Sequence, residues 1–486
     1  MSLALDPAPP REMSARETPA RVRPPAVVGE GRRPRPPAPV PLDAVPGTLA
    51  LLKGLRDNPV ATWTRWHFEQ PIVHGRNVLG SAAVVSDPAV IRHVLVGNAA
   101  NYDKGELQRR TLGGGLGTGL LLAEGDQWRA QRRALAPLFS PRHVDGFKRS
   151  MVEVADEMVE RWARLRDGRR IDIANEMARA TLRVLGRTVF SEAMSGPEDR
   201  FARVVSAFLE SVGQVDPLDI LGMPAWLPRL GAARTKPLLR YFEEEVTAIL
   251  DKRRALLASG APAPQDLLTL LLAARDPETG AGLSDDDVRA NVVTFLIAGH
   301  ETTSNTLTWA LYLLSQHPEE RAAVEREVDD LMPEGRVDPG RVDDFVRTRA
   351  VLEEAMRLYP PAASITREAL GPDTLGTLRV KARTLVIVSP YVLHRHRLLW
   401  DAPDHFHPSR FMPENRGGID RFAFLPFGAG PRVCIAASFA LQEAVILLAT
   451  ALRHVRLDHA PGHEVMPVQR ITLRSRGGMP MILRRR

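Results

Sequence analysis

Cys434 is the single cysteine in a chain of 486 residues, and it lies in the segment FLPFGAGPRVCIAASFA, residues 424–440. One cysteine can form neither an internal disulfide nor a zinc site built from several thiolates. The preceding loop contains two glycines, and an apolar helical pattern begins directly after the cysteine. A helix that starts there directs unpaired backbone N–H groups towards the sulfur, which favours the metal-binding thiolate. The thiol is therefore either a small buried apolar group or a metal ligand at the end of a tight loop.

The composition is that of an ordinary globular protein, with 44% hydrophobic and 25% charged residues. A formal net charge of +7 would allow a nucleic-acid partner. Beyond the N-terminal segment, however, arginines are interleaved with acids and no aromatic–basic stripe occurs, which argues against nucleic-acid binding. No run of about 18 apolar residues is present, so we expect no transmembrane anchor. We expect a soluble, cytoplasmic protein that is a monomer.

The chain divides into a tail and one large domain. Residues 1–40 hold ten prolines and seven arginines with almost no apolar periodicity, which predicts a disordered tail. Residues 41–486 are predicted to form a single domain. Its pattern is helical at 51–66, strand-like within 73–96, and mainly helical from 128 to 357. Short β runs follow at 377–380 and 384–393, with a closing pair at 471–476 and 479–484 and a helix at about 438–452. The fold class is mainly α with a small β part.

A polar motif, AGHETTSNT at residues 298–306, lies in the middle of a long apolar helix that Ser284 is expected to cap. Gly299 leaves space beside the helix. Thr302 can donate to the carbonyl of Ala298, which bends a helix and opens room for water, and Glu301 supplies an acid beside that opening. The alternative is a kinked helix with a buried polar cluster. A zinc-binding HExxH motif is excluded because residue 304 is serine.

Two further pairs have helical spacing. Glu354 and Arg357 lie on one face of a helix that two prolines end, a pattern usually seen in solvated ion pairs. Trp128 and Arg132 lie one turn apart on a helix that Asp126 is expected to cap, and their N–H groups suit a carboxylate. The histidine pairs at 394/396 and 405/407 could bind a metal, but two histidines without a cysteine favour a structural role.

The spacing F-x-x-G-x-x-x-C resembles the haem-ligand loop of the cytochrome P-450 monooxygenases. Four other elements resemble those of the family and occur in the order that it requires: W-x-x-x-R (128–132), A-G-x-E-T-T (298–303), E-x-x-R (354–357) and F-x-P-x-R-F (406–411). Two positions depart from the family pattern, with Ala436 in place of a glycine and Ser409 in place of a glutamate. The resemblance implies the cytochrome P-450 fold, with haem b (iron protoporphyrin IX) between the long distal helix and the helix after the cysteine loop.

The resemblance also implies roles for individual residues. Cys434 would be the iron ligand, and Thr302 and Glu301 would deliver protons during oxygen activation. Glu354, Arg357 and Arg410 would form a buried charge network that holds the cysteine loop. The other positions implied to bind haem are Trp128, Arg132, Arg367 and Arg432 at the propionates and Phe427, Gly428, Ala298 and Gly299 along its faces.

No flavin or iron–sulfur domain and no dinucleotide-binding motif is evident in the sequence, so electrons are expected from a separate ferredoxin or flavodoxin with its reductase, docked on a basic face near Arg432. The variable segments expected to line the pocket are apolar: 104–121, 208–230, 362–365 and a hairpin near Gly477. They favour a lipophilic substrate such as a fatty acid, terpenoid, steroid or polyketide. Two alternatives stay open: a peroxide-using peroxygenase, against which Glu301 and Thr302 argue, and a haem-based ligand sensor.

Overall fold

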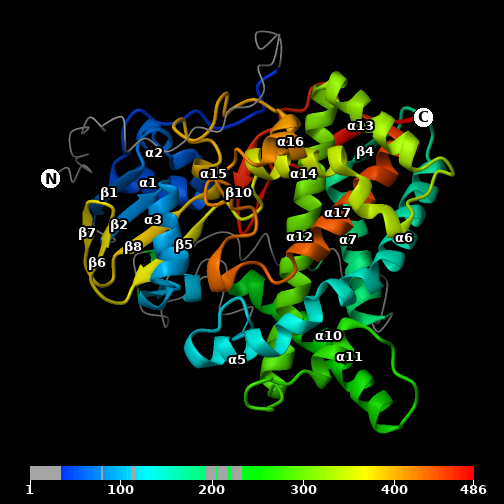
Figure 1. The fold of residues 1–486 in the computed structure, drawn as a ribbon, viewed down its shortest axis with the longest axis horizontal. Coiled ribbons are helices and arrows are strands. Elements are labelled where there is room, and N and C mark those ends of the chain that lie inside the picture. Colours follow the sequence, from blue (N-terminus) through cyan, green and yellow to red (C-terminus); the bar gives the residue numbers. More distant parts are fainter. Residues whose placement is uncertain are drawn as a thin grey trace.

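The computed structural model describes residues 34–77, 80–106, 108–110, 117–191, 204, 217–220, 223 and 232–486. Figure 1 shows a β-rich side that carries β1, β2, β5 and β8, and a helical side that carries α6, α7 and α17, with α12 passing between them. The predicted class, mainly α with a small β part, is confirmed. Residues 1–33 of the predicted tail lie outside the described residues. Just after them, the carbonyl of Pro37 accepts a hydrogen bond of 2.9 Å from the Tyr359 hydroxyl.

The α-helices are α1 (Thr48–Asp57), α2 (Arg65–Glu69), α3 (Pro88–Arg92), α5 (Gly125–Leu135), α6 (Pro141–Ala163), α7 (Ile173–Leu185), α9 (Pro217–Ile220), α10 (Ala232–Ala258), α11 (Leu267–Ala273), α12 (Asp285–Gln316), α13 (Pro318–Leu331), α14 (Val346–Leu358), α15 (Pro390–Leu393), α16 (Pro413–Arg416) and α17 (Ala437–His454). The predicted cap of α12 is confirmed, because Ser284 Oγ accepts from the N–H of Asp287 over 3.1 Å. Three aspartates follow in its first turn, where they complement the helix dipole.

The largest sheet has five strands in the order β1 (Ile72–Asn77), β2 (Gly80–Val85), β8 (Leu385–Val388), β5 (Ile365–Ala369) and β3 (Tyr102–Asp103). Its β2 and β8 are parallel, and its other pairs are antiparallel. In a three-stranded sheet, β12 (Pro480–Arg485) pairs with β4 (Arg170–Asp172) on one side and β9 (Val455–His459) on the other. Two further sheets pair β10 (Pro467–Gln469) with β11 (Leu473–Ser475) and β6 (Asp373–Leu375) with β7 (Leu378–Val380).

Two details of the β prediction are wrong. The run at 384–393 stays extended only to Val388, because Pro390 begins the short helix α15. The strands near 471–476 and 479–484 do not pair with each other: β11 pairs with β10, and β12 pairs with β9 and β4. A local pattern shows that a segment is extended, but the choice of partner depends on distant parts of the chain.

The predicted charge network is confirmed and fully buried. Glu354 and Arg357 on α14 form a bidentate pair, with N···O distances of 2.7 and 2.8 Å, and neither side chain is exposed. Arg410 Nε lies 3.5 Å from Glu354 Oε1. The same carboxylate oxygen accepts from the N–H of His407 over 2.8 Å. One carboxylate therefore joins α14 to the chain segment that precedes the cysteine loop.

His394 extends this network towards the cysteine loop. Its carbonyl accepts from Arg357 Nη1 over 2.8 Å, and its ring Nε2 accepts from the N–H of Leu425 over 2.8 Å. Burial lowers the pKa of His394 to about 3, and the charge of Arg357 adds to the effect, so the neutral acceptor ring is favoured. The structural role predicted for this histidine is confirmed.

Replacing Glu354 with Gln is expected to destabilise the protein by about 3–5 kcal/mol, because two buried guanidinium groups lose their carboxylate. Urea denaturation of wild type and E354Q measures the difference. E244Q is the matched control, since the exposed pair Arg240–Glu244 spans one helical turn and is expected to contribute less than about 1 kcal/mol.

The effect of E354Q also depends on pH. Burial opposes ionisation of Glu354, but the charge of Arg357, with that of Arg410, holds the pKa below its usual value. A depressed carboxyl pKa contributes stability above the unfolded pKa and loses it as the pH falls through the folded pKa. The difference in free energy of unfolding between wild type and E354Q is therefore expected to become smaller at acidic pH. An equal difference at neutral and acidic pH would contradict the assignment.

Candidate functional site

The cysteine loop is a tight backbone structure that packs against the π-helical turn His93–Gly97. Gly428 and Gly430 have φ values of +73° and +72°, a region that favours glycine. The N–H of Cys434 donates to the carbonyl of Phe427 over 2.9 Å and closes the loop. A Cβ on Gly430 would lie 1.9 Å from the carbonyl oxygen of Leu95, so no side chain fits there.

The Cys434 thiol opens into the interior cavity rather than into packed core. Burial raises the pKa of the thiol, while the N–H of Ala436 and the charge of Arg132 act in the opposite direction. An N–H donor expected at the helix start is thus present, but in the absence of a metal it lowers the pKa of the thiol less than burial raises it. A metal ion ionises a thiol that coordinates it. Ala436 has φ −102° and ψ 20°, which alanine adopts without strain, so this departure from the family pattern is accommodated.

One cavity of about 660 Å³ collects most of the predicted site residues. It lies between α12, the cysteine loop and the start of α17, which Figure 1 shows beside one another at the centre of the molecule. The predicted residues that line it are Trp128, Arg132, Ala298, Gly299, Thr302, Arg367, Phe427, Gly428, Arg432 and Cys434. Glu301 is not among the lining residues.

The α12 wall of the cavity has the predicted helix-bending bond. Thr302 Oγ1 donates to the carbonyl of Ala298 over 2.8 Å. Gly299 has a packing role that the sequence did not indicate, since a Cβ there would lie 3.2 Å from both methyl groups of Leu185 on α7. The glycine therefore lets α7 approach α12 closely, besides lining the cavity.

Glu301 is directed towards β11 and is almost completely buried. Burial raises its pKa, while the charge of Arg474 and a hydrogen bond with Thr472 act the other way. The Thr472 hydroxyl also accepts from Asn305 Nδ2 over 2.9 Å. Among the described residues, Glu301 Oε2 has no hydrogen-bond partner. The carboxyl group thus favours its protonated form one residue from the threonine that lines the cavity.

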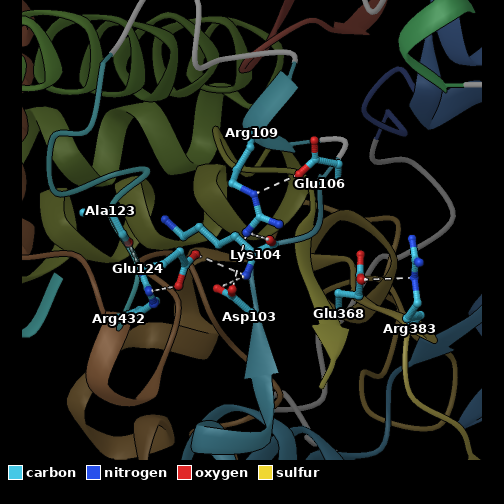
Figure 2. Close-up of polar contacts among 9 residues, drawn as sticks. All are labelled: Asp103, Lys104, Glu106, Arg109, Ala123, Glu124, Glu368, Arg383 and Arg432. Atoms are coloured by element: carbon cyan, nitrogen blue, oxygen red, sulfur yellow. Dashed lines mark hydrogen bonds and ion pairs between the residues drawn. The ribbon is translucent and has the colours of Figure 1, made fainter. Parts of the chain in front are cut away.

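Basic side chains from several elements line the cavity, and Figure 2 shows two of them, Lys104 and Arg432. The guanidinium of Arg432 lies 4.4 Å from the ring centroid of Trp128, and its Nη1 donates to the carbonyl of Ala123 over 3.0 Å. Arg132 donates to the carbonyl of Val433 over 3.0 Å. Burial, with the charge of Arg432, lowers the pKa of Arg367 to about 10. This part of the cavity lining, which we call the cationic edge, is therefore crowded with cations.

Lys104 belongs to this edge, although the sequence indicated it only as the start of a variable segment. Its Nζ donates to the carbonyl of Leu121. Burial, with the charges of Arg432 and Arg367, lowers the pKa of Lys104 to about 7. The expected cap of α5 is wrong: Asp126 lies in the first turn, and Glu124 occupies the capping position without a side-chain cap, because its carboxylate pairs with Arg432 instead.

Comparison with known proteins identifies the family. The family model described as "Cytochrome P450" matches residues 54–479. The chain belongs to the cytochrome P-450 family. The cyclooctatin synthase of Streptomyces melanosporofaciens is 32% identical over 79% of this chain and 83% of its own length. The cyclooctat-9-en-7-ol 5-monooxygenase of the same organism is 33% identical, over 78% and 81% respectively. A crystal structure of a cytochrome P-450 (CYP102L1) has a TM-score of 0.78 at 26% identity and covers 93% of this chain and 100% of its own.

The protein is a monooxygenase of this family, whose cofactor is haem bound to a cysteine thiolate. The donor set of the cavity fits that group. Within the described chain, the cavity lining carries five basic side chains and a thiol but no aspartate or glutamate. Such a lining suits a metal complex that bears negative side groups, since buried cations require partners.

The predicted pocket segments are partly correct. Residues from 104–121 and 362–365 line the cavity. Most of 208–230 lies outside the described residues. The hairpin near Gly477 is the wrong one, because the turn Gln469–Ile471 between β10 and β11 reaches the cavity instead. In the described chain, none of the helices combines the length and hydropathy needed to cross a bilayer.

Replacing Gly430 with Ala is expected to remove most bound haem and to lower the melting temperature strongly. The new methyl group would collide with the Leu95 carbonyl, in addition to a cost of about 1–3 kcal/mol for a left-handed alanine. G462A is the control: Gly462 has φ +79°, and a Cβ there would meet no atom within 4 Å. Absorbance and thermal melts measure both effects, and equal losses in the two variants would contradict the steric explanation.

Proposed function

We propose that this cytochrome P-450 inserts one oxygen atom of O2 into a lipophilic small molecule, most simply as a hydroxylation, with Cys434 as the ligand of haem b. The observation that carries the proposal is that the Cys434 thiol and the Thr302 hydroxyl, from elements far apart in the sequence, line the same cavity. When bound, the haem supplies dioxygen binding and electron transfer. The residues of the chain would position the haem, surround it with charged groups and supply the protons.

The cationic edge would hold the haem propionates. Trp128, Arg132, Arg367 and Arg432 are the proposed contacts, and Lys104 joins them. Phe427 and Gly428 would lie along the face of the haem nearer the thiolate, and Ala298 and Gly299 along the opposite face. The low pKa values of Lys104 and Arg367 support this, because a cation buried among cations gains most from a bound anion.

Thr302 and Glu301 are proposed to supply protons. Thr302 donates its hydroxyl hydrogen to Ala298, so its oxygen lone pairs can accept a hydrogen bond from a water in the cavity. Glu301 favours its protonated form because it is buried, and it is adjacent in sequence to that hydroxyl. The pair can thus hold a proton close to the reacting atoms without opening the cavity to bulk water.

The substrate is proposed to be lipophilic. The cavity wall away from the cationic edge is mainly apolar, with lining residues that include Leu120, Leu185, Val189, Phe295 and Ile365. The relative named cyclooctat-9-en-7-ol 5-monooxygenase acts, by its name, on cyclooctat-9-en-7-ol, which is also lipophilic. Fatty acids, terpenoids, steroids and polyketides all satisfy this chemistry.

We propose that the protein is a monomer in the cytoplasm. Its electrons would come from a separate ferredoxin or flavodoxin with its reductase. Pro431, three residues before Cys434, is exposed and does not line the cavity, so a partner can approach the cysteine loop from outside. Charge reversals on basic residues around this face should slow reduction and reduce its dependence on salt. Unchanged reduction rates would contradict this docking face.

The purified protein is expected to give the red-shifted Soret band that a thiolate ligand produces in the reduced carbon monoxide complex. C434S should lose this band, because serine does not supply a thiolate. S438A on the same helix should keep it. A red protein without the band would contradict the ligand assignment, and a colourless protein would contradict haem binding.

Replacing Thr302 with Ala is expected to lower the yield of oxidised product per electron by roughly tenfold or more, because proton delivery is impaired. T308A is the matched control, since Thr308 is bonded to the carbonyl of Ser304 over 2.7 Å on the same helix but does not line the cavity. A substrate found by a spectral binding screen of fatty acids, terpenoids, steroids and polyketides is turned over, and product and peroxide are both measured to give the yield. Turnover with peroxide alone that T302A leaves intact would favour a peroxygenase, and binding without turnover would favour a sensor.

A further inference from the structure

A pair of carboxyl groups contacts Lys104 and Arg432, two of the cations proposed to hold the propionates. Asp103 ends β3, and Glu124 precedes α5. The N–H of Lys104 donates to Asp103 Oδ1 over 2.7 Å and to Glu124 Oε1 over 3.2 Å (Figure 2). Because a single N–H contacts both groups, the two carboxyls are adjacent. Adjacent carboxylates repel each other, so such a pair favours keeping one proton.

Glu124 connects this pair to the cation beside Trp128. Its second oxygen, Oε2, forms an ion pair with Arg432 Nη2 (Figure 2). The guanidinium of Arg432 is fixed further by the indole ring and by the carbonyl of Ala123. The charge of Glu124 therefore acts directly on a residue proposed to bind a propionate. Its side chain is 22% exposed, so it can exchange protons with solvent.

The charges around Glu124 come from several elements. They are Asp103 and Lys104 at the end of β3, Arg109 in the following segment, Arg367 on β5 and Arg432 in the cysteine loop. Burial, with the hydrogen bond to Asp103, raises the pKa of Glu124 to about 7. Burial acts the same way on Asp103, but hydrogen bonds from Glu124 and the Lys104 N–H hold its pKa below the usual value. Asp103 is thus ionised first, and Glu124 keeps the proton.

We propose that the Asp103–Glu124 pair carries one exchangeable proton beside the haem propionates and thereby makes the reduction potential of the haem depend on pH. Glu124 is a positioning residue that acts through Arg432. Reduction adds one electron at the haem and favours uptake of one proton from solvent by Glu124. Loss of that proton leaves an extra negative charge, which stabilises the oxidised iron. The potential therefore falls as the pH rises. This inference rests on the proposed function, because it requires haem held by Cys434.

The test is a spectroelectrochemical titration of the haem-loaded protein between about pH 6 and pH 8. At a fixed applied potential, the ratio of reduced to oxidised haem in wild type is expected to fall on the order of three- to tenfold across this range. E124Q should abolish the dependence. D103N should move it to lower pH, because the neighbouring negative charge is gone.

Two control variants separate Glu124 from its neighbours. E106Q, on the same segment but paired with Arg109 and Arg110, should keep the wild-type dependence. K104M, which removes a cation beside Glu124, should move the dependence to higher pH, opposite in direction to D103N, without abolishing it. A flat wild-type titration would overturn the proposal, as would a dependence that survives in E124Q or disappears in K104M alone.

The design does not depend on one variant being stable. If E124Q loses haem, the wild-type slope and the direction of the D103N shift decide the outcome. A protein without the thiolate carbon monoxide band would show that the proposed function has failed. A protein with that band but a potential independent of pH would show that this inference alone has failed.

Discussion

The buried carboxylate of Glu354 is the interaction on which the position of the site depends. It neutralises Arg357 and Arg410 where no water reaches them, and Arg357 in turn bonds carbonyls of the segment between β8 and the cysteine loop. His394 passes this constraint to Leu425, two residues before Phe427. A buried ion pair contributes little net stability compared with apolar packing, but its directionality fixes how segments are placed. Here the placed segment carries the thiol.

The cavity combines two kinds of surface with different physical origins. The apolar wall follows from packing of α7, α12 and the loops around them, and it suits a lipophilic substrate. The cationic edge is costly in the isolated chain, as the lowered pKa values of Lys104 and Arg367 indicate. An anionic partner removes that cost, so binding energy is concentrated where the prosthetic group would be anchored. The Asp103–Glu124 pair moderates the excess of positive charge at the same edge.

Much of the site could be predicted from the sequence because its residues lie within short motifs. The cysteine loop, Thr302 with its bond to Ala298, and the Glu354–Arg357 pair each depend on contacts between near neighbours. Short motifs could not reveal Lys104, Glu124 or the turn at 469–471. They carry no distinctive spacing, and the chain's tertiary packing, rather than a local pattern, brings them to the cavity or to the cations that line it. Glu124 illustrates the difficulty, since its capping position suggests a local role while its side chain bonds Arg432, 308 positions away.

The sequence by itself determined the helical class, the thiol loop and its helix, the hydrogen bond from Thr302 to Ala298 within α12, and the family, because each depends on local backbone preference or on spacing. Tertiary structure decided the remainder. It placed the Cys434 thiol in the wall of a cavity, brought the Leu95 carbonyl so close to Gly430 that no side chain fits there, brought Leu185 close to Gly299, and directed Glu301 towards β11. Each of these depends on how closely distant segments approach and how much water they exclude, and neither quantity is encoded in any short stretch of residues.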